Sequence, residues 1–198
     1  ANPSRIAWSP DGAHIAFVMK VSAPAPTLGT VEKSPEGANW QPQPFITERL
    51  RFRFDGAGLI GNETHDVFVA TVATGEVRRL THGEALFGGP LGVAGSLSWS
   101  PDGRFLVTSA HTAHEADYTP RESDVYSVDT QSGAVQRLTR LPGGEARGAI
   151  SPDGRWLAFL RTERSPLNHQ DPRLAVVPVG GGAMKILSAP LDRPVSGL

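Results

Sequence analysis

The sequence has no cysteine among its 198 residues, and its formal net charge is only −1. Without thiols, neither a disulfide framework nor a thiolate metal site can form, and a reducing compartment such as the cytoplasm is favoured. The small net charge gives no electrostatic reason to bind nucleic acid or an anionic membrane. No apolar run approaches the roughly 20 residues that a membrane-spanning helix needs. We therefore expect no nucleic-acid partner and no membrane partner.

The composition is otherwise that of a globular protein with many turns and an internal repeat. Hydrophobic residues make up 39% of the chain, and glycine and proline occur 22 and 17 times. One five-residue pattern occurs three times, twice as Trp-Ser-Pro-Asp-Gly and once with isoleucine in place of tryptophan. The copies are Trp8–Gly12, Trp99–Gly103 and Ile150–Gly154. An apolar segment follows each copy, which indicates tandem structural units.

Each copy of the pattern has the chemistry of a tight turn. Proline presets φ in a type I turn, serine and aspartate bond nearby amides, and glycine adopts the left-handed conformation. Such a turn commonly joins two antiparallel strands. Since the aspartates recur once per unit, we expect them to lie far apart and to be structural. The turn residues are Asp11, Gly12, Asp102, Gly103, Asp153 and Gly154.

A second half-unit follows each of these turns, with two apolar segments around a glycine-containing turn. Each unit therefore predicts four antiparallel strands, and no helix is expected. Four-stranded units repeated at about 40–50 residues are typical of β-propeller blades. A β-sandwich with a coincidental turn motif is the alternative, and three copies in phase disfavour it. The paired segments are 66–72 with 76–81, 124–129 with 134–139, and 173–179 with 183–187.

We therefore predict one all-β domain, a partial β-propeller of three four-stranded antiparallel blades in an open ring. The predicted blades span 1–83 (with a long insertion), 84–141 and 142–190, and 191–198 begins a further blade. Closed propellers have about 4 to 8 blades, so three cannot close a ring. We expect a piece of a longer protein, whose open blade faces are covered by the missing remainder of the propeller or by self-association.

The turn and the Ile-Ala-Phe type strand after it resemble the repeat of two kinds of propeller. One belongs to serine peptidases of the prolyl oligopeptidase family, and the other is the TolB-like (or, more broadly, WD-like) interaction propeller. The basic and aromatic segment 46–58, which ends in Asp55-Gly56-Ala57-Gly58, resembles the acylaminoacyl-peptidase branch of the peptidases. The loop 117–126 is similar to that branch as well. This resemblance covers essentially the whole chain.

The resemblance implies a function shared with a second domain. Such peptidases join the propeller to an α/β-hydrolase domain with a Ser-Asp-His triad and a Gly-x-Ser-x-Gly elbow. No such elbow occurs in this sequence, so we expect neither catalytic residues nor a cofactor here. The propeller would gate the hydrolase site and help to bind short peptides. The alternative is a TolB-like protein-interaction propeller without an enzymatic domain.

A segment of the insertion, Arg49–Phe54, alternates arginine with apolar residues, and we predict a strand there. Because side chains alternate with period two, Arg49, Arg51 and Arg53 would share one face. Guanidinium groups hold carboxylates through bidentate hydrogen bonds. These three arginines are our candidates for substrate binding, and the simpler alternative is a solvated strand whose arginines pair with acids elsewhere.

His111 and His114, with Glu115 and Asp117 close by, superficially resemble a zinc pattern. We expect them in a loop between two strands, where no helix aligns the histidines. A polar loop is therefore the better interpretation, and we predict no metal site.

The tryptophans divide into two groups. Trp8, Trp99 and Trp156 are core candidates, since the first two share one repeat position and would pack between blades. Trp40 lies in the proline- and glycine-rich stretch 23–44, which we expect to be a loop. We consider it a candidate for docking on a partner domain.

Overall fold

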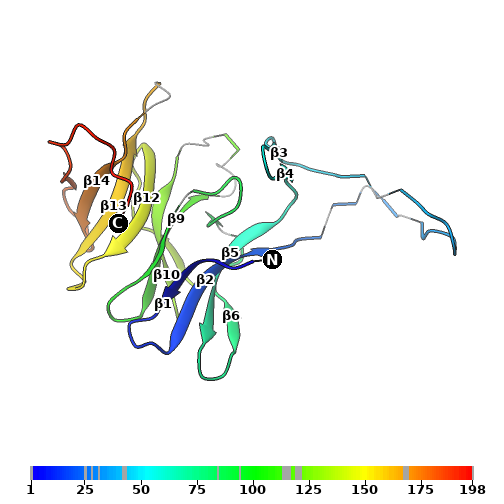
Figure 1. The fold of residues 1–198 in the computed structure, drawn as a ribbon, viewed down its shortest axis with the longest axis horizontal. Helices are drawn as coiled ribbons and strands as arrows, with labels where there is room; N and C mark the ends of the chain where they lie inside the picture. Colours follow the sequence, from blue (N-terminus) through cyan, green and yellow to red (C-terminus); the bar gives the residue numbers. More distant parts are fainter. Residues whose placement is uncertain are drawn as a thin grey trace.

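A computed structural model gives the fold of most of the chain. The described residues are 2–24, 26–27, 29–30, 32–41, 44–83, 85–93, 95–112, 117–118, 122–166 and 170–197. Within these ranges the regular structure consists of strands alone, so no helix is present that could cross a membrane. Three antiparallel sheets stand side by side in chain order, and a long excursion leaves the first of them (Figure 1).

The first blade has the strand order β1-β2-β5-β6. Its strands are β1 (Ser4–Trp8), β2 (His14–Val21), β5 (Thr64–Thr71) and β6 (Val77–Arg79). Between β2 and β5 lies an insertion, residues 22–63, which holds the two-stranded hairpin β3 (Arg53–Phe54) and β4 (Gly58–Leu59). The insertion therefore interrupts the chain between two neighbouring strands without entering the sheet.

The second and third blades repeat this order. Blade 2 contains β8 (Leu97–Trp99), β9 (Phe105–Thr112), β10 (Asp124–Asp129) and β11 (Val135–Arg137). A short extra strand, β7 (Ala85–Leu86), pairs with the end of β9, so this sheet has five strands where the repeat predicts four. Blade 3 contains β12 (Gly143–Ile150), β13 (Trp156–Glu163), β14 (Arg173–Pro178) and β15 (Lys185–Ile186). The predicted all-β partial propeller is confirmed.

The Ser-Pro-Asp-Gly segments form the same hydrogen-bonded turn in all three blades. In the first, Ser9 Oγ donates to Asp11 Oδ1 at 2.5 Å and accepts from the amide of His14 at 2.8 Å. The serine–aspartate bond is 2.6 Å long in the second turn and 2.5 Å in the third. The three glycines have φ of 70°, 70° and 74°, which favours glycine because it has no Cβ. The turn is thus a local structure that forms from its own residues.

The core lies between blades, because each sheet has two faces and neighbouring sheets cover them. Leu106 and Val107 are successive residues of β9 and both are fully buried, yet they belong to different clusters. Leu106 packs with blade 1 residues such as Val67, and Val107 packs with blade 3 residues such as Phe159. This follows from the period-two alternation of strand side chains. Blade 2 is therefore held on both sides.

The tryptophan prediction is correct for one copy of the turn motif and wrong for another. Trp99 is half-buried against the core that blades 1 and 2 share. Trp8 is exposed, although it occupies the same repeat position. Trp8 pairs with Ile15, and Ala7 pairs with Ala16, so Trp8 points away from blade 2. Trp8 remains 60% exposed, because among the described residues no sheet lies on its side of blade 1. Trp156 is half-buried, with the Lys185 ammonium 5.9 Å from its ring centre.

The two ends of the blades differ. At the turn end, short turns join the first strand of each blade to the second and the third to the fourth. At the loop end, longer segments join the second strand to the third and lead on to the next blade. The insertion projects from this loop end (Figure 1).

Candidate functional site

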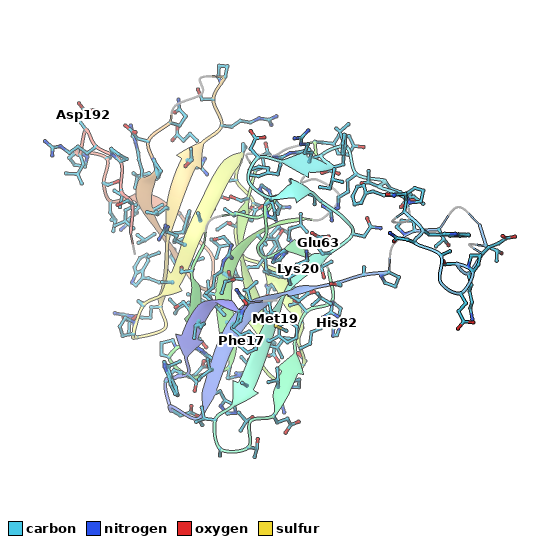
Figure 2. All side chains as sticks on the ribbon, turned by 45° about the vertical axis from the view of Figure 1, so that its right-hand side comes forward. Phe17, Met19, Lys20, Glu63, His82 and Asp192 are labelled. Carbon is cyan, nitrogen blue, oxygen red and sulfur yellow. The ribbon has the colours of Figure 1, made fainter. Side chains whose placement is uncertain are left out.

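The insertion at the loop end of blade 1 is fixed at its base. Strands β2 and β5 pair along their whole length, as far as Val21 opposite Thr64. At the same point Lys20 Nζ lies 3.0 Å from Glu63 Oε1 (Figure 2). The two feet of the insertion are therefore adjacent, and any function of residues 22–63 is presented from the loop end.

The predicted strand over Arg49–Phe54 is wrong for most of its length. Only Arg53 and Phe54 are in β3, opposite Leu59 and Gly58 of β4. The amide of Ile60 donates to the carbonyl of Phe52 at 2.8 Å, which extends the hairpin by one bond. Arg49 and Arg51 precede this hairpin and lie outside the strands of the described residues. Arg49, Arg51 and Arg53 therefore do not share one face of a continuous strand, contrary to the prediction.

The three arginines still lie close in sequence at the loop end, with different exposure. Arg49 and Arg51 are half-buried, whereas Arg53 is exposed. The Arg49 amide donates to Thr47 Oγ1 at 3.1 Å, which orients the chain locally. The substrate-binding role of Arg49, Arg51 and Arg53 remains a prediction.

The insertion also exposes large apolar side chains. Trp40 and Phe45 are exposed, as are several residues of the hairpin region. An apolar group with basic residues beside it suits contact with a partner surface more than contact with water. The exposed residues in the hairpin region are Leu50, Phe52, Phe54 and Leu59.

The expected polar loop at 111–117 is partly a strand. His111 is buried within β9 and pairs with Leu86 of β7, so it does not belong to a loop. The added strand β7 explains the difference, because it extends the sheet beyond the four-stranded repeat. His114 and Glu115 lie outside the described residues. Among the residues that the structure does describe, including Asp117, no group of three or more metal-ligating side chains is found.

An acid in blade 1 is surrounded by donors, and sequence reasoning missed it. Asp66 is fully buried at the start of β5. Its Oδ2 accepts from Thr64 Oγ1 at 2.6 Å and from Arg79 at 2.7 Å. Its Oδ1 accepts from Thr81 Oγ1 at 2.9 Å and from the Gly83 amide at 3.0 Å. A buried carboxylate needs such partners, so this cluster ties β5 to β6 and to the segment after it.

The cluster is repeated in blade 2, and its spacing is the signal that could have revealed it. Arginine and threonine follow the aspartate by thirteen and fifteen residues in both blades. Asp124 pairs with Arg137 at 2.5 Å, and Thr139 Oγ1 donates to Asp124 at 3.5 Å. The threonine hydroxyl also accepts a strand amide, at 3.0 Å in blade 1 and 2.9 Å in blade 2.

Blade 3 keeps only the hydroxyl of this cluster. Arg173 and Ile186 stand where the other blades have aspartate and arginine. Ser188 Oγ accepts from the Leu174 amide at 2.9 Å, like the threonines. The ion pair is therefore a property of blades 1 and 2, which favours a structural role over a shared binding site.

Another buried acid lies where blades 2 and 3 meet. Glu145 in β12 is fully buried, and its Oε1 lies 2.6 Å from Arg161 of β13. Burial, together with the neighbouring Asp124 carboxylate, raises the pKa of Glu145 to about 7, and Arg161 opposes the rise. Burial also raises the pKa of Asp124, against the influence of Arg137. The joint therefore contains two acids and two arginines at close range.

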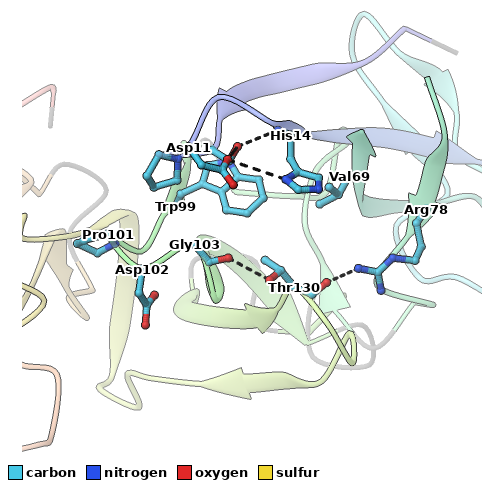
Figure 3. Close-up of a pocket in the computed structure, with 11 residues that line it drawn as sticks. Asp11, His14, Val69, Arg78, Trp99, Pro101, Asp102, Gly103 and Thr130 are labelled. Carbon is cyan, nitrogen blue, oxygen red and sulfur yellow. Dashed lines mark hydrogen bonds and ion pairs between the residues drawn. The ribbon is translucent and has the colours of Figure 1, made fainter. Parts of the chain in front are cut away.

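A cleft of about 240 Å³ lies between the turn ends of blades 1 and 2 (Figure 3). Its polar groups already have protein partners. Arg78 donates to the carbonyls of Thr130 and Gln131, and Asp11 accepts from Ser9 and from the Ala13 amide. The Arg78 contacts join the two blades, whereas the Asp11 contacts lie within the turn of blade 1, so the cleft follows from blade packing.

Comparison with known proteins agrees with this architecture. No family model matches the chain. The uncharacterized peptidase YuxL of Bacillus subtilis is 29% identical over 123 residues, which cover 62% of this chain and 17% of that protein. The chain thus spans about a sixth of the length of this relative.

Solved structures share the fold along nearly the whole chain. Pyrococcus horikoshii acylaminoacyl peptidase matches with a TM-score of 0.59 at 16% identity, over 99% of this chain and 26% of that one. A putative TolB from Agrobacterium tumefaciens matches with a TM-score of 0.56 at 18% identity, over 94% of this chain and 49% of that one. The chain is therefore a partial β-propeller that resembles the propeller domains of acylaminoacyl-peptidase and prolyl oligopeptidase-family peptidases and also TolB-like propellers.

Proposed function

We propose that this chain is the non-catalytic propeller portion of a serine peptidase of the acylaminoacyl-peptidase type. In this role it gates the active site of an α/β-hydrolase domain outside these residues and helps to bind short peptides. The observation that carries the proposal is the structural match to an acylaminoacyl peptidase over 99% of the chain. The sequence similarity to the peptidase YuxL supports it.

The physical basis of gating is steric and electrostatic. A propeller over a hydrolase site admits only short, flexible chains and keeps bulk water from the reaction. Arg49, Arg51 and Arg53 would add a positive group at the loop end, where a peptide carboxylate is held through charge-assisted hydrogen bonds. The exposed Phe52 and Phe54 beside them suit the apolar parts of a peptide or of the second domain.

A TolB-like interaction propeller is the second candidate, and the fold match to the Agrobacterium protein favours it. In that case the exposed apolar side chains of the insertion would contact a protein partner, and no peptide would be hydrolysed. The two candidates differ in whether a hydrolase domain belongs to the same polypeptide.

The test compares residues 1–198 with the longest polypeptide that the same reading frame encodes, on a short blocked peptide ester. We expect hydrolysis by the longer polypeptide and none by residues 1–198. In the longer polypeptide, changing Arg49, Arg51 and Arg53 together to alanine should raise KM at least about tenfold with little change in kcat. Arg155→Ala is the matched control, because Arg155 is exposed at the turn end.

Each other result has a definite meaning. Hydrolysis by residues 1–198 alone would contradict the non-catalytic assignment. A longer polypeptide that hydrolyses nothing would overturn the peptidase proposal and support the interaction propeller. An unchanged KM in the triple variant would remove the arginines from the substrate site.

A further inference from the structure

A groove of about 580 Å³ lies between the fourth strands of blades 1 and 2. Residues of β6 and of the segment after it form one wall, and residues of β11 and its flanking segments form the other. Each of these two strands is the last of its sheet. Both walls belong to blades 1 and 2, so no further blade is needed to form this cavity. We call it the fourth-strand groove.

The pairing of the strands directs two arginines into the groove. Arg78 lies opposite Val69, and Arg137 lies opposite Tyr126. Val69 and Tyr126 both belong to the core that blades 1 and 2 share, and residues opposite each other in neighbouring strands point to the same face. Arg79 points to the other face of its sheet, where it pairs with a buried aspartate.

The two walls are held at a fixed separation. Arg78 donates to the carbonyls of Thr130 and Gln131 in the turn of blade 2. A Cβ on Gly133 would lie 2.4 Å from the carbonyl oxygen of Leu80, so the blades meet here with no room for a side chain. A site that is formed before its ligand arrives binds with a smaller entropic cost.

The groove is basic, and its charge is only partly neutralised. Among the described residues that line it are four arginines and His82, and none is acidic. Arg137 shares its charge with Asp124 at 2.5 Å, whereas Arg78 donates to neutral carbonyls. Arg140 is exposed, and neither it nor Arg78 forms an ion pair with a described residue. Two guanidinium groups can therefore hold an anion.

The surroundings favour a short acidic segment of a protein over a nucleic acid. Guanidinium groups hold carboxylates through paired hydrogen bonds. The chain as a whole has 19 lysines and arginines and 20 aspartates and glutamates, so a long polyanion would meet negative charge beyond the groove. Tyr126, the aromatic residue of the lining, is only 4% exposed, which leaves no ring there on which a base could stack.

We propose that the fourth-strand groove binds a short acidic segment of a partner protein. Carboxylates of this segment contact Arg78, Arg137 and Arg140. The inference does not depend on the proposed peptidase function, because the arginines of the insertion take no part in it.

Fluorescence anisotropy of labelled octaglutamate tests the proposal on the longest polypeptide that the reading frame encodes. We expect binding that weakens as NaCl rises from about 0.05 to about 0.3 M, because salt screens charge pairs, and no binding of octaglutamine. Arg140→Glu should weaken binding at least about tenfold, since a like charge then faces the peptide. Arg140→Lys keeps the charge and should bind more tightly than Arg140→Glu. Because Arg140 is exposed, circular dichroism of both variants should be that of the unchanged polypeptide.

Two controls locate the bound peptide. Arg155→Glu makes the same change in charge at an exposed position of blade 3 and should leave binding unchanged. Changing Arg49, Arg51 and Arg53 together to alanine should also leave octaglutamate binding unchanged, whatever it does to ester hydrolysis. A loss of binding in this triple variant would place the peptide on the insertion and overturn the proposal.

Three further results would overturn it. One is the absence of octaglutamate binding even at low salt. The second is an equal loss of binding in Arg140→Glu and Arg155→Glu, which would mean that net charge attracts the peptide without the groove. The third is tighter binding of a DNA oligonucleotide than of octaglutamate, with the same dependence on Arg140, which would make the groove a nucleic-acid site.

Discussion

The Trp99 indole donates its Nε1 hydrogen to the Ala7 carbonyl at 3.1 Å, from one blade to the next. Because the acceptor belongs to the backbone, this bond depends on the tryptophan alone. Trp99 is the first residue of the turn motif of blade 2, and Ala7 directly precedes the turn motif of blade 1, 92 positions earlier in the sequence. It therefore couples the stability of blade 1 to that of blade 2.

Trp99→Phe should lower the free energy of unfolding by about 1–2 kcal/mol, since it removes this hydrogen bond and leaves the Ala7 carbonyl without its indole donor. Urea denaturation followed by circular dichroism measures the change. Trp40→Phe is the control and should alter stability by less than about 0.5 kcal/mol, because Trp40 is exposed in the insertion. Equal losses in the two variants would show that Trp99 does not connect the blades.

Arg79→Met should destabilise the chain by about 3 kcal/mol or more, because it leaves the fully buried Asp66 without its charged partner. Arg155→Met removes an exposed ion pair with Asp153 and should cost about 1 kcal/mol or less. The midpoints of urea denaturation of the two variants give the changes in stability, provided that the slope of free energy against urea concentration stays the same. A loss for Arg79→Met no larger than for Arg155→Met would mean that the hydroxyl and amide donors suffice for Asp66.

Glu145 should make stability fall as the pH rises from about 4.5 to about 7. Its pKa is raised from 4.5 to about 7 by burial and by Asp124, so the folded chain holds the proton more tightly than the unfolded chain does. The stabilisation is fully present below the unfolded pKa and is lost as the pH passes the folded pKa, on the order of 2–3 kcal/mol. Glu145→Gln keeps a neutral side chain and should remove this dependence.

Urea titrations at several pH values between 5 and 8 measure the difference between Glu145→Gln and the unchanged chain. As the pH rises, the free energy of unfolding of Glu145→Gln should increase relative to that of the unchanged chain. Glu163→Gln, at the exposed end of β13, is the control and should show no such trend. A constant difference between Glu145→Gln and the unchanged chain would mean that Glu145 stays ionised in the folded state, paired with Arg161.

Gly148→Ala should weaken the joint between blades 2 and 3. A Cβ at Gly148 would lie 2.5 Å from Val125 Cγ1 and 2.9 Å from Val107 Cγ1, closer than packed carbons allow. We expect a loss of about 1–3 kcal/mol from overpacking. Gly180→Ala meets no atom within 4 Å and is the matched control. If both substitutions left the melting temperature unchanged, the joint would be looser than this geometry indicates.

The sequence was sufficient for the features that neighbouring residues determine. The Ser-Pro-Asp-Gly turns form from five consecutive residues, so their pattern predicts both the hairpins and the blade repeat. The exposure of Trp8 could not be predicted in this way, because it depends on whether a sheet lies beside blade 1. The repeat makes Trp8 and Trp99 equivalent, and only their surroundings distinguish them.

The candidate site was harder to predict, since its geometry depends on contacts between distant residues. Alternation over Arg49–Phe54 suggested a strand, but a strand needs a partner, and β4 pairs only with the last two of these residues. The Asp66 cluster has a spacing signal in the sequence, whereas Glu145 has none. Glu145 lies near Asp124 only because blade 3 packs on blade 2. The sequence repeat contains no pattern that predicts this contact.

The pairing of β2 with β5 has a consequence for how this chain can vary. Because Val21 lies opposite Thr64, the sheet itself holds the two ends of residues 22–63 together. Changing the length of a loop whose ends are already adjacent costs little, about 0.6 kcal/mol for each doubling. The insertion can therefore be shortened, lengthened or exchanged between homologues while the blade beneath it stays the same, which makes it the part of this molecule best suited to acquiring a new specificity.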